Sequence, residues 1–228
     1  MTGDALPPDY DERPERFRLA RAVLREHAAR PDIHADVARR LLAEGVTPVL
    51  DVGCGEGELA RHLPKGAWVG LDSSPAMLAA APGPVIRGDA TALPYPEGSF
   101  GSVALLYVLY HLPEPDLALA EAHRVLRPGG LLAVAAPSRH DSPELSHVLG
   151  SAGLTFDAEL APELIGRRFG ELEIESWDAP LVRLPSRDAV RDYLVGKGVD
   201  PGRAREAAAA VDVPLDVTKR GALIIARR

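Results

Sequence analysis

The chain has a single cysteine, Cys54, among its 228 residues. One cysteine cannot form a disulfide within the chain or supply a zinc cluster, and such sparing use fits a reducing compartment. Long hydrophobic runs are also missing, because the longest apolar stretch, 102–109, is far shorter than a membrane span. The N-terminus lacks the basic start and apolar segment of a secretory signal. We therefore expect a cytoplasmic location and no membrane partner.

Positive charge is scarce as well. Lysine and arginine total 26 against 33 aspartate and glutamate residues, so the formal net charge is −7. A large nucleic-acid interface needs clustered basic side chains, so we expect no nucleic-acid partner. The spacing of histidines and acids predicts no metal site. A hydrophobic content of 46% and a charged content of 26% are ordinary for a globular domain.

The length fits one sizeable α/β domain. Apolar residues recur at helical spacing over 13–42, and we expect two helices there, separated at Pro31, with Asp32 capping the second. From residue 47 onward, short apolar strands alternate with helices. The predicted strands are 47–52, 68–71, 85–87, 101–107 and 131–136, and the predicted helices are 58–63, 74–80 and 115–126, the last ended by Pro128-Gly129-Gly130. This alternation predicts a parallel sheet with helices on both faces.

The pattern changes after Pro137. Segments 143–150, 158–169, 187–195 and 203–210 have helical patterns, and strand candidates at 172–177 and 222–226 could close the sheet as an antiparallel pair. We therefore predict a doubly wound, Rossmann-like, mostly parallel sheet of seven strands in a single domain, 1–228. It would comprise an N-terminal helical cap at 13–45, a core at 46–137, and further helices with the C-terminal strands at 138–228.

A glycine-rich loop follows the first predicted strand, in VLDVGCGEGELA at 49–60. Glycine is needed where the backbone turns sharply and approaches a ligand without a Cβ in the way. The helix N-terminus behind the loop offers free N–H groups to an electron-rich ligand. The spacing is G-x-G-x-G, with Glu58 directly after Gly57, and so departs from the G-x-G-x-x-G of dinucleotide sites. We expect this loop to bind a ligand at the carboxyl edge of the sheet.

Three acids accompany the loop. Asp51 precedes it, Asp72 ends the second strand, and Asp89 follows the third. A carboxylate at the end of the second strand suits two ribose hydroxyls, because it accepts both hydrogen bonds. A carboxylate near the loop favours a cationic amine or sulfonium and repels a pyrophosphate.

The segments VLDVGCGEGELA, GLDSSPAML, GDATALPYPEGSFGSVALLYVLYHLPEP and EAHRVLRPGGLLAVAAPS follow one another in the chain. In this order they resemble class I S-adenosylmethionine-dependent methyltransferases, most closely the small-molecule group that includes ubiquinone/menaquinone-biosynthesis-like enzymes. The resemblance covers about 47–137. It implies S-adenosyl-L-methionine as cofactor, and methyl transfer to an O, N or C nucleophile of a small molecule.

The resemblance also implies roles for individual residues. Asp51 and the loop Gly53, Cys54, Gly55 and Gly57 would hold the methionine portion of the cofactor, and Asp72 the ribose. Ser73 or Met77 would flank the adenine, Asp89 and Ala90 would hydrogen-bond to it, and Tyr107 would lie near the transferable methyl. The N-terminal helices and 158–210 would form a lid, so that Tyr10, Arg16, Phe17 and Arg21 approach from above.

Catalysis needs little from the protein, since a sulfonium is already activated and the chain must hold the reactants in line and exclude water. His111 follows the fourth strand, and we interpret it either as a base or substrate contact that titrates near neutrality, or as a cap or packing residue. Tyr110 has the same two interpretations. His140 and Asp141 either pair to orient a base or lie in a solvated loop. Four aromatic residues either line a pocket or pack in the core: Phe156, Phe169, Trp177 and Tyr193.

Three alternatives remain. An NAD-dependent oxidoreductase is disfavoured by the loop spacing and by Asp51 and Asp89. The second alternative is a nucleic-acid or protein methyltransferase. Enzymes that methylate amino groups of DNA or RNA bases often carry an Asn/Asp-Pro-Pro-aromatic tetrad after the fourth strand, where this chain has Leu-Tyr-Val-Leu at 106–109. The third is a protein that binds the cofactor without catalysis. The sequence does not identify the substrate, and it leaves open whether the protein is a monomer or a homodimer.

Overall fold

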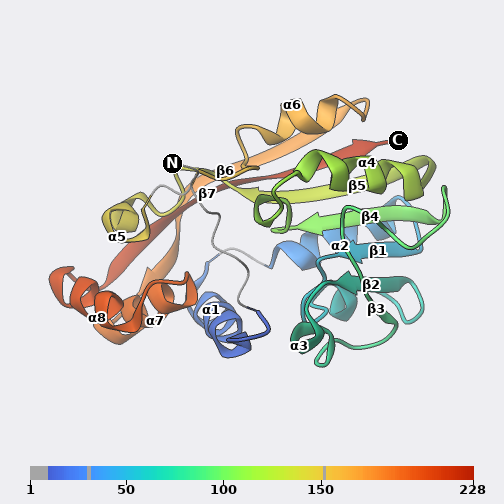
Figure 1. The fold of residues 1–228 in the computed structure, drawn as a ribbon. Helices are drawn as coiled ribbons and strands as arrows, with labels where there is room; N and C mark the ends of the chain where they lie inside the picture. The colour runs from blue at the N-terminus through green and yellow to red at the C-terminus, as the bar shows by residue number, and fades with distance from the viewer. Residues whose placement is uncertain (1–9, 30–31, 151–152) are drawn as a thin grey trace.

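The computed structural model describes residues 10–29, 32–150 and 153–228, which build one seven-stranded sheet (Figure 1). The strands are β1 Val49–Val52, β2 Trp68–Asp72, β3 Val85–Arg87, β4 Phe100–Leu106, β5 Leu126–Pro137, β6 Leu172–Leu184 and β7 Leu215–Arg227. Their order is β3-β2-β1-β4-β5-β7-β6; the first five run parallel, and β7 pairs antiparallel with β5 and β6. This topology confirms the doubly wound, mostly parallel prediction.

Several helix boundaries follow from side-chain capping. The helices are α1 Pro14–His27, α2 Ile33–Ala43, α3 Pro75–Leu78, α4 Pro115–Val125, α5 Ser146–Leu149, α6 Ala161–Gly166, α7 Arg187–Gly196 and α8 Pro201–Ala210, with 3-10 turns η1 Leu59–His62, η2 Leu109–His111 and η3 Pro143–Leu145. Asp32 caps α2 as predicted, and Ser74 caps α3 with Pro75 at the first position. Pro31, the expected helix breaker, lies outside the described residues.

Four predicted elements differ in the structure. The helix expected at 58–63 is the short 3-10 turn η1. The segment 128–130 belongs to β5, which begins directly after α4; a Cβ on Gly130 would lie 2.8 Å from the carbonyl oxygen of Gly101, so the glycine permits a close strand approach. β6 and β7 are 13 residues each, much longer than predicted, because β6 exposes charged side chains that hide its alternation.

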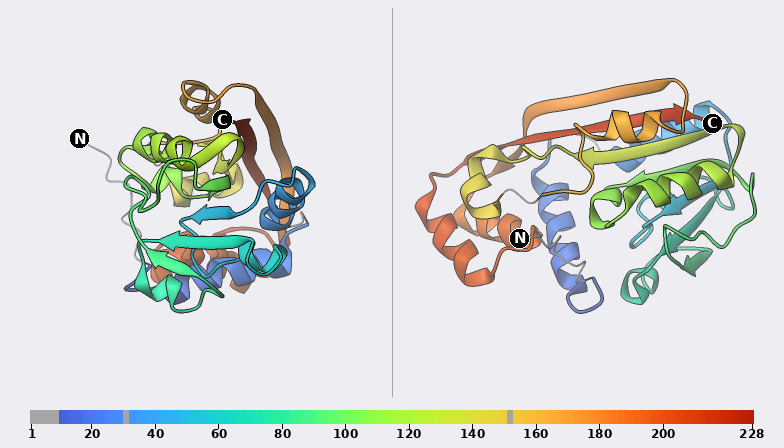
Figure 2. Two further views of the ribbon diagram at one scale, coloured as in Figure 1. Left: turned by 90° about the vertical axis from the view of Figure 1, so that its right-hand side faces the viewer. Right: turned by 45° about the horizontal axis from the view of Figure 1, so that its top comes forward.

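The sheet is covered on both faces. Val103 and Leu105 of β4 pack in the cluster that contains α4 and α6, and Ala104 and Leu106 pack in the cluster that contains α2. Figure 2 shows α4 and α6 on the same side of the sheet. Helix α6 belongs to the segment expected as lid, but it packs on the sheet and contributes to the core.

Beyond the carboxyl ends of the parallel strands, the β6–β7 hairpin continues and forms a third hydrophobic cluster with α1, α7 and α8. We call this group of elements the outer lobe. In Figure 1 the arrowheads of β4 and β5 point toward it. The lobe therefore places α1 and α7 beside the ends of the strands where ligands bind in such sheets. Among the described residues, no helix is both long and apolar enough to cross a membrane.

Candidate active site

A cavity of about 2110 Å³ lies between the carboxyl ends of the strands and the outer lobe. Its lining includes Gly53, Asp72, Asp89, Tyr107 and His111, which were all predicted site residues. Ligand pockets commonly measure about 300–1,000 Å³, so the space suffices for a nucleoside cofactor together with a second small molecule.

The glycine loop has the backbone that its sequence predicts. Gly53, Gly55 and Gly57 have φ angles of +70°, +54° and +74°, a region that other residues rarely adopt. A Cβ on Gly53 would lie 2.4 Å from Val108 Cγ2, and one on Gly57 would lie 2.6 Å from Pro82 Cδ. Glycine at these positions is therefore required both by the turn and by the close packing around it.

Asp72 ends β2 beside the loop. Its Oδ2 accepts a hydrogen bond from Gly55 N at 2.8 Å, and its Oδ1 accepts one from Ser74 N at 2.9 Å. These bonds fix the carboxylate at the cavity lining, and each oxygen keeps a lone pair for a further donor. Two neighbouring hydroxyls, such as those of a ribose, fit that acceptor pair.

Asp51 occupies a different position from the other acids. It is 4% exposed, accepts a hydrogen bond from Trp68 Nε1 at 3.1 Å, and is not among the described residues that line the cavity. Burial raises the pKa of Asp51 to about 6. Its influence on a ligand would therefore act through its charge from behind the loop.

The predicted adenine residues lie together in the cavity lining. Ser73, Met77, Asp89 and Ala90 all contribute to it. Asp89 Oδ1 accepts hydrogen bonds from the backbone N and the hydroxyl of Thr91, both at 2.8 Å, which orients the carboxylate. Met77 is buried and supplies an apolar surface of the kind that flanks a purine ring.

Cys54 lies in the same loop. It is buried, and burial raises the pKa of its thiol well above the ordinary value. A Cβ on Gly70 would lie 2.7 Å from Cys54 Sγ, so the side chain packs against β2. The thiol is therefore inert, and the contribution of Cys54 to the cavity is its place in the loop.

Tyr107 follows β4 with a φ of +60°. Positive φ at a residue other than glycine costs about 1–3 kcal/mol and collects at functional sites. Tyr107 N donates to the Ala135 carbonyl at 2.9 Å, which holds this conformation against β5, and the residue lines the cavity. The hydrogen bond to β5 therefore fixes the backbone of Tyr107 at the cavity lining.

His111 lies in η2 and contacts the segment that precedes α1. Its Nε2 is 2.9 Å from the Tyr10 hydroxyl. Burial, assisted by the charge of Arg16, lowers the pKa of His111 to about 4. The expectation of titration near neutrality is therefore wrong, and the ring is neutral at physiological pH. Tyr110 packs on it at 4.2 Å between ring centroids, and burial raises the pKa of that phenol.

The N-terminal segment closes over the loop, as expected for Tyr10, Arg16, Phe17 and Arg21, which all line the cavity. Arg18 Nε pairs with Glu56 at 2.7 Å, and Arg21 with Glu58 at 3.1 Å. Sequence reasoning missed Asp11, whose carboxylate accepts hydrogen bonds from Ser74 Oγ and Ala76 N. Its contacts lie 63 and 65 residues away along the chain, so no local pattern marks it.

His140 and Asp141 were expected either to pair or to lie in a solvated loop. His140 is exposed in a turn, as the second interpretation expects, whereas for Asp141 both interpretations are wrong. Its carboxylate accepts a hydrogen bond from Lys219 Nζ and lies 3.7 Å from Lys197 Nζ, whereas His140 N donates to Ser138 Oγ. Sequence reasoning missed both lysines. Of the four aromatic candidates, Trp177 lines the cavity, and Phe156, Phe169 and Tyr193 are buried in the hydrophobic clusters.

Asp32, Glu58 and His62 are the group of described residues whose spacing resembles a metal site, with ligand atoms within 4.8 Å of one another. Arg21 contacts both carboxylates, at 3.6 Å from Asp32 and 3.1 Å from Glu58. The arginine supplies the counter-charge that a cation would otherwise provide, so ion pairing explains the cluster.

Known proteins resemble the part of the chain that carries the loop. Residues 50–134 match the family model described as a methyltransferase domain. Trans-aconitate 2-methyltransferase of Deinococcus radiodurans is 37% identical over 137 residues, which are 57% of this chain and 51% of that protein. A 2-phytyl-1,4-naphtoquinone methyltransferase of Synechococcus elongatus is 37% identical over 162 residues, covering 64% of this chain and 60% of that protein. The matched part of the chain thus spans between 51% and 60% of the length of these two relatives.

A solved structure resembles nearly the whole chain. It is a SAM-dependent methyltransferase of Thermotoga maritima, described as a possible histamine N-methyltransferase, with a TM-score of 0.63 and 18% identity. The alignment covers 96% of this chain and 97% of that one. At this identity the likeness establishes a shared fold.

Proposed function

Because the chain carries a class I S-adenosylmethionine-dependent methyltransferase domain, we propose that the protein as a whole transfers a methyl group from S-adenosyl-L-methionine to a small molecule. The family match and the related proteins confirm the resemblance seen in the sequence, the cofactor expected from it, and the seven-stranded fold. They also decide against an NAD-dependent oxidoreductase. The proposal concerns the acceptor and the activity of the complete chain.

The observation that carries the proposal is the joint geometry of the loop and Asp72. Gly53 and Gly55, both with positive φ, bring bare backbone to the cavity, and Gly55 N holds the Asp72 carboxylate there, whereas Gly57 packs against Pro82 and is not among the lining residues. The residues present fit the cofactor: Asp72 for the ribose, Met77 and Asp89 for the adenine, and the loop backbone for the methionine portion. When bound, the cofactor supplies an electrophilic methyl group on a sulfonium.

The remaining side chains position the acceptor and exclude water. Tyr107, with its strained backbone, lies where β4 ends, and His111 lies just beyond it in the cavity lining. Tyr10 and the ion pairs of α1 hold the N-terminal segment over the loop. In-line displacement depends on alignment of the reacting groups and on exclusion of water, and an N-terminal segment held over the loop serves both.

The relatives' names divide between an acid, trans-aconitate, and a quinone, and both are small molecules. We infer a small-molecule acceptor for this chain also, in a cytoplasmic protein that is a monomer or a homodimer. The net charge of −7 opposes binding to nucleic acid, as the sequence predicts.

The test is a screen of small amines, phenols and carboxylic acids for S-adenosylhomocysteine formation. We expect turnover of at least one class by the wild type and none by Asp72→Ala. Failure of the wild type to bind S-adenosylhomocysteine would refute the proposal. Product formation by Asp72→Ala at the wild-type rate would refute the assigned role of Asp72.

A further inference from the structure

The turn between β2 and α3 carries residues that we assign to the cofactor, Asp72, Ser73 and Met77. Ser74, at the centre of this turn, is 3% exposed. Its backbone N donates to Asp72 Oδ1 at 2.9 Å, and its hydroxyl accepts from Met77 N at 3.2 Å. The same hydroxyl donates to Asp11 Oδ1 at 2.5 Å. Ser74 therefore connects the carboxylate assigned to the ribose with an acid of the N-terminal segment.

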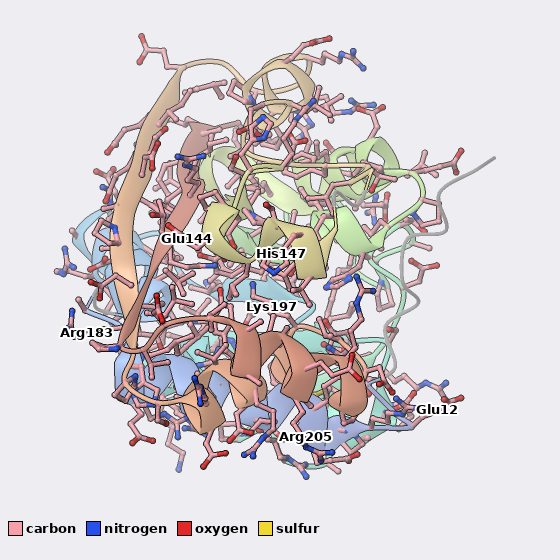
Figure 3. The ribbon with its side chains drawn as sticks, turned by 90° about the vertical axis from the view of Figure 1, so that its left-hand side faces the viewer. Glu12, Glu144, His147, Arg183, Lys197 and Arg205 are labelled. Carbon is pink, nitrogen blue, oxygen red and sulfur yellow. The ribbon has the colours of Figure 1, made fainter. Side chains whose placement is uncertain are left out.

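Asp11 binds the turn at two points. Besides the Ser74 hydroxyl, its Oδ1 accepts from Ala76 N at 3.1 Å, one of the amides at the start of α3 that has no acceptor within the helix. The hydrogen bond from Ser74, followed by that from Ala76, holds the pKa of Asp11 below its ordinary value. Figure 3 shows Glu12, the next residue, at the edge of the molecule near α1. Asp11 thus adds a second cap to a helix that Ser74 already caps.

The segment that carries Asp11 is also attached to the glycine loop. A Cβ on Gly55 would lie 3.6 Å from Phe17 Cζ, so the phenyl ring packs against the loop backbone. Arg18 Nε pairs with Glu56 in the same loop at 2.7 Å. Because Phe17 and Arg18 belong to α1 and Asp11 directly precedes that helix, one segment contacts both the loop and the β2–α3 turn. These are the two elements to which we assign the cofactor.

Asp11 itself is not among the described residues that line the cavity, so any effect on a ligand passes through the residues that it holds. A carboxylate binds two hydroxyls well only if its own position is fixed by surrounding contacts. We propose that Asp11 is a positioning residue for the methyl donor: through Ser74 it fixes the turn that presents Asp72 to the ribose. The proposal rests on the proposed methyltransferase function. It adds a residue that lies outside the matched segment 50–134.

Three variants separate this role from a general effect of charge. Asp11→Ala removes the acceptor of both hydrogen bonds, whereas Asp11→Asn keeps an Oδ1 acceptor and removes the charge. Glu15→Ala is the matched control, because Glu15 is an exposed acid of the same segment that takes no part in these bonds and lies outside the cavity lining.

Calorimetric titration with S-adenosylhomocysteine measures the affinity of each variant. We expect Asp11→Ala to weaken binding about fivefold, a modest loss because the Asp11 side chain is exposed. Asp11→Asn should recover most of the affinity, and Glu15→Ala should bind as the wild type does. The melting temperature of ligand-free Asp11→Ala should stay within about 2 °C of the wild type, since an exposed contact contributes little to global stability.

A double variant tests the route through Ser74. Ser74→Ala removes the hydroxyl that joins Asp11 to the turn and leaves the backbone N that donates to Asp72. In the Ser74→Ala background, Asp11→Ala should therefore weaken binding of S-adenosylhomocysteine twofold or less. A full fivefold loss in that background would mean that Asp11 acts by another route, and would overturn the proposal.

The remaining outcomes are equally decisive. Equal affinity of the wild type and Asp11→Ala for S-adenosylhomocysteine overturns the proposal and leaves the methyltransferase function standing. A loss that Asp11→Asn does not recover, or that Glu15→Ala shares, also overturns it. Failure of the wild type to bind S-adenosylhomocysteine overturns the proposed function itself.

Discussion

Asp51 and His111 are buried titratable groups whose pKa values shift in opposite directions. Burial raises the pKa of Asp51 to about 6. As the pH rises, the unfolded chain therefore loses this proton at a lower pH than the folded protein does. Its contribution to stability is complete below the unfolded pKa of about 3.9 and is lost as the pH rises through about 6. At neutral pH the charged carboxylate therefore destabilises the fold.

Asp51→Asn removes that charge and keeps an acceptor for Trp68 Nε1. Near neutral pH we expect the free energy of unfolding to rise by about 1–3 kcal/mol, from a shift worth 1.36 kcal/mol per pKa unit. Urea unfolding as a function of pH measures this free energy. The wild type should lose stability between about pH 4 and 6, and the variant should not. Asp212→Asn, at an exposed position, is the control. Destabilisation at neutral pH, with the pH dependence intact, would contradict the account.

His111 has the opposite linkage. Because burial lowers its pKa to about 4, its contribution to stability is present above the unfolded pKa of about 6.5 and is lost as the pH falls toward 4. His111→Gln keeps a hydrogen-bonding side chain near Tyr10 but cannot titrate. We expect turnover to fall by about 10- to 100-fold, as for loss of a positioned polar group, with unchanged affinity for S-adenosylhomocysteine.

Two further results would test the neutral ring. We expect the wild type and His111→Gln to give the same shape of kcat against pH around pH 6.5, without a step that only the wild type shows. Such a step would mean that the ring titrates near neutrality. Unchanged turnover in the variant would instead return His111 to a packing role, which was the other interpretation of its sequence position.

Among the secondary-structure elements, the glycine loop makes the sharpest prediction. Gly53→Ala must place a Cβ 2.4 Å from Val108 Cγ2 at a φ of +70°, so both strain and a clash follow. We expect a loss of about 2–4 kcal/mol of stability, together with weaker binding of S-adenosylhomocysteine. Gly45→Ala is the control, because its φ is +66° but nothing lies within 4 Å of the added atom. Its cost should be about 1 kcal/mol, with binding intact; equal effects of the two substitutions would contradict the packing argument.

The elements differ in how far the sequence predicts them. The five parallel strands are apolar because both faces are covered, and capping by Asp32 and Ser74 marks two helix starts. The lengths of β6 and β7 escape prediction because the hairpin is half exposed and carries charges. The 128–130 segment looks like a helix stop, yet Gly130 is there to let β5 approach Gly101 of β4.

The residues of the candidate site also differ in how far the sequence predicts their positions. The loop and Asp72 are contiguous with their strands, so local spacing predicts where they lie. By contrast, Arg16 donates to the carbonyl of Gly196, 180 residues away, and Asp141 accepts a hydrogen bond from Lys219, 78 residues away. No periodicity links such positions, and burial, which sets the pKa of His111, depends on the completed fold.

In the molecule as a whole, the match to the methyltransferase family ends at residue 134, before the outer lobe is complete. The loop, Asp72 and Asp89 lie inside the matched segment, whereas Tyr10, Arg16, Lys197 and Lys219 lie outside it. We therefore propose that the matched core holds the methyl donor, and that residues outside it contribute to the binding of the acceptor.

The central claim is that the loop and Asp72 hold S-adenosylmethionine. Calorimetric titration of the wild type and of Asp72→Ala with S-adenosylhomocysteine and, separately, with NADH tests it directly. The account predicts binding of S-adenosylhomocysteine by the wild type, a loss of about 100-fold or more in Asp72→Ala, about 2.7 kcal/mol, and no binding of NADH. Tight binding of NADH without binding of S-adenosylhomocysteine would contradict it.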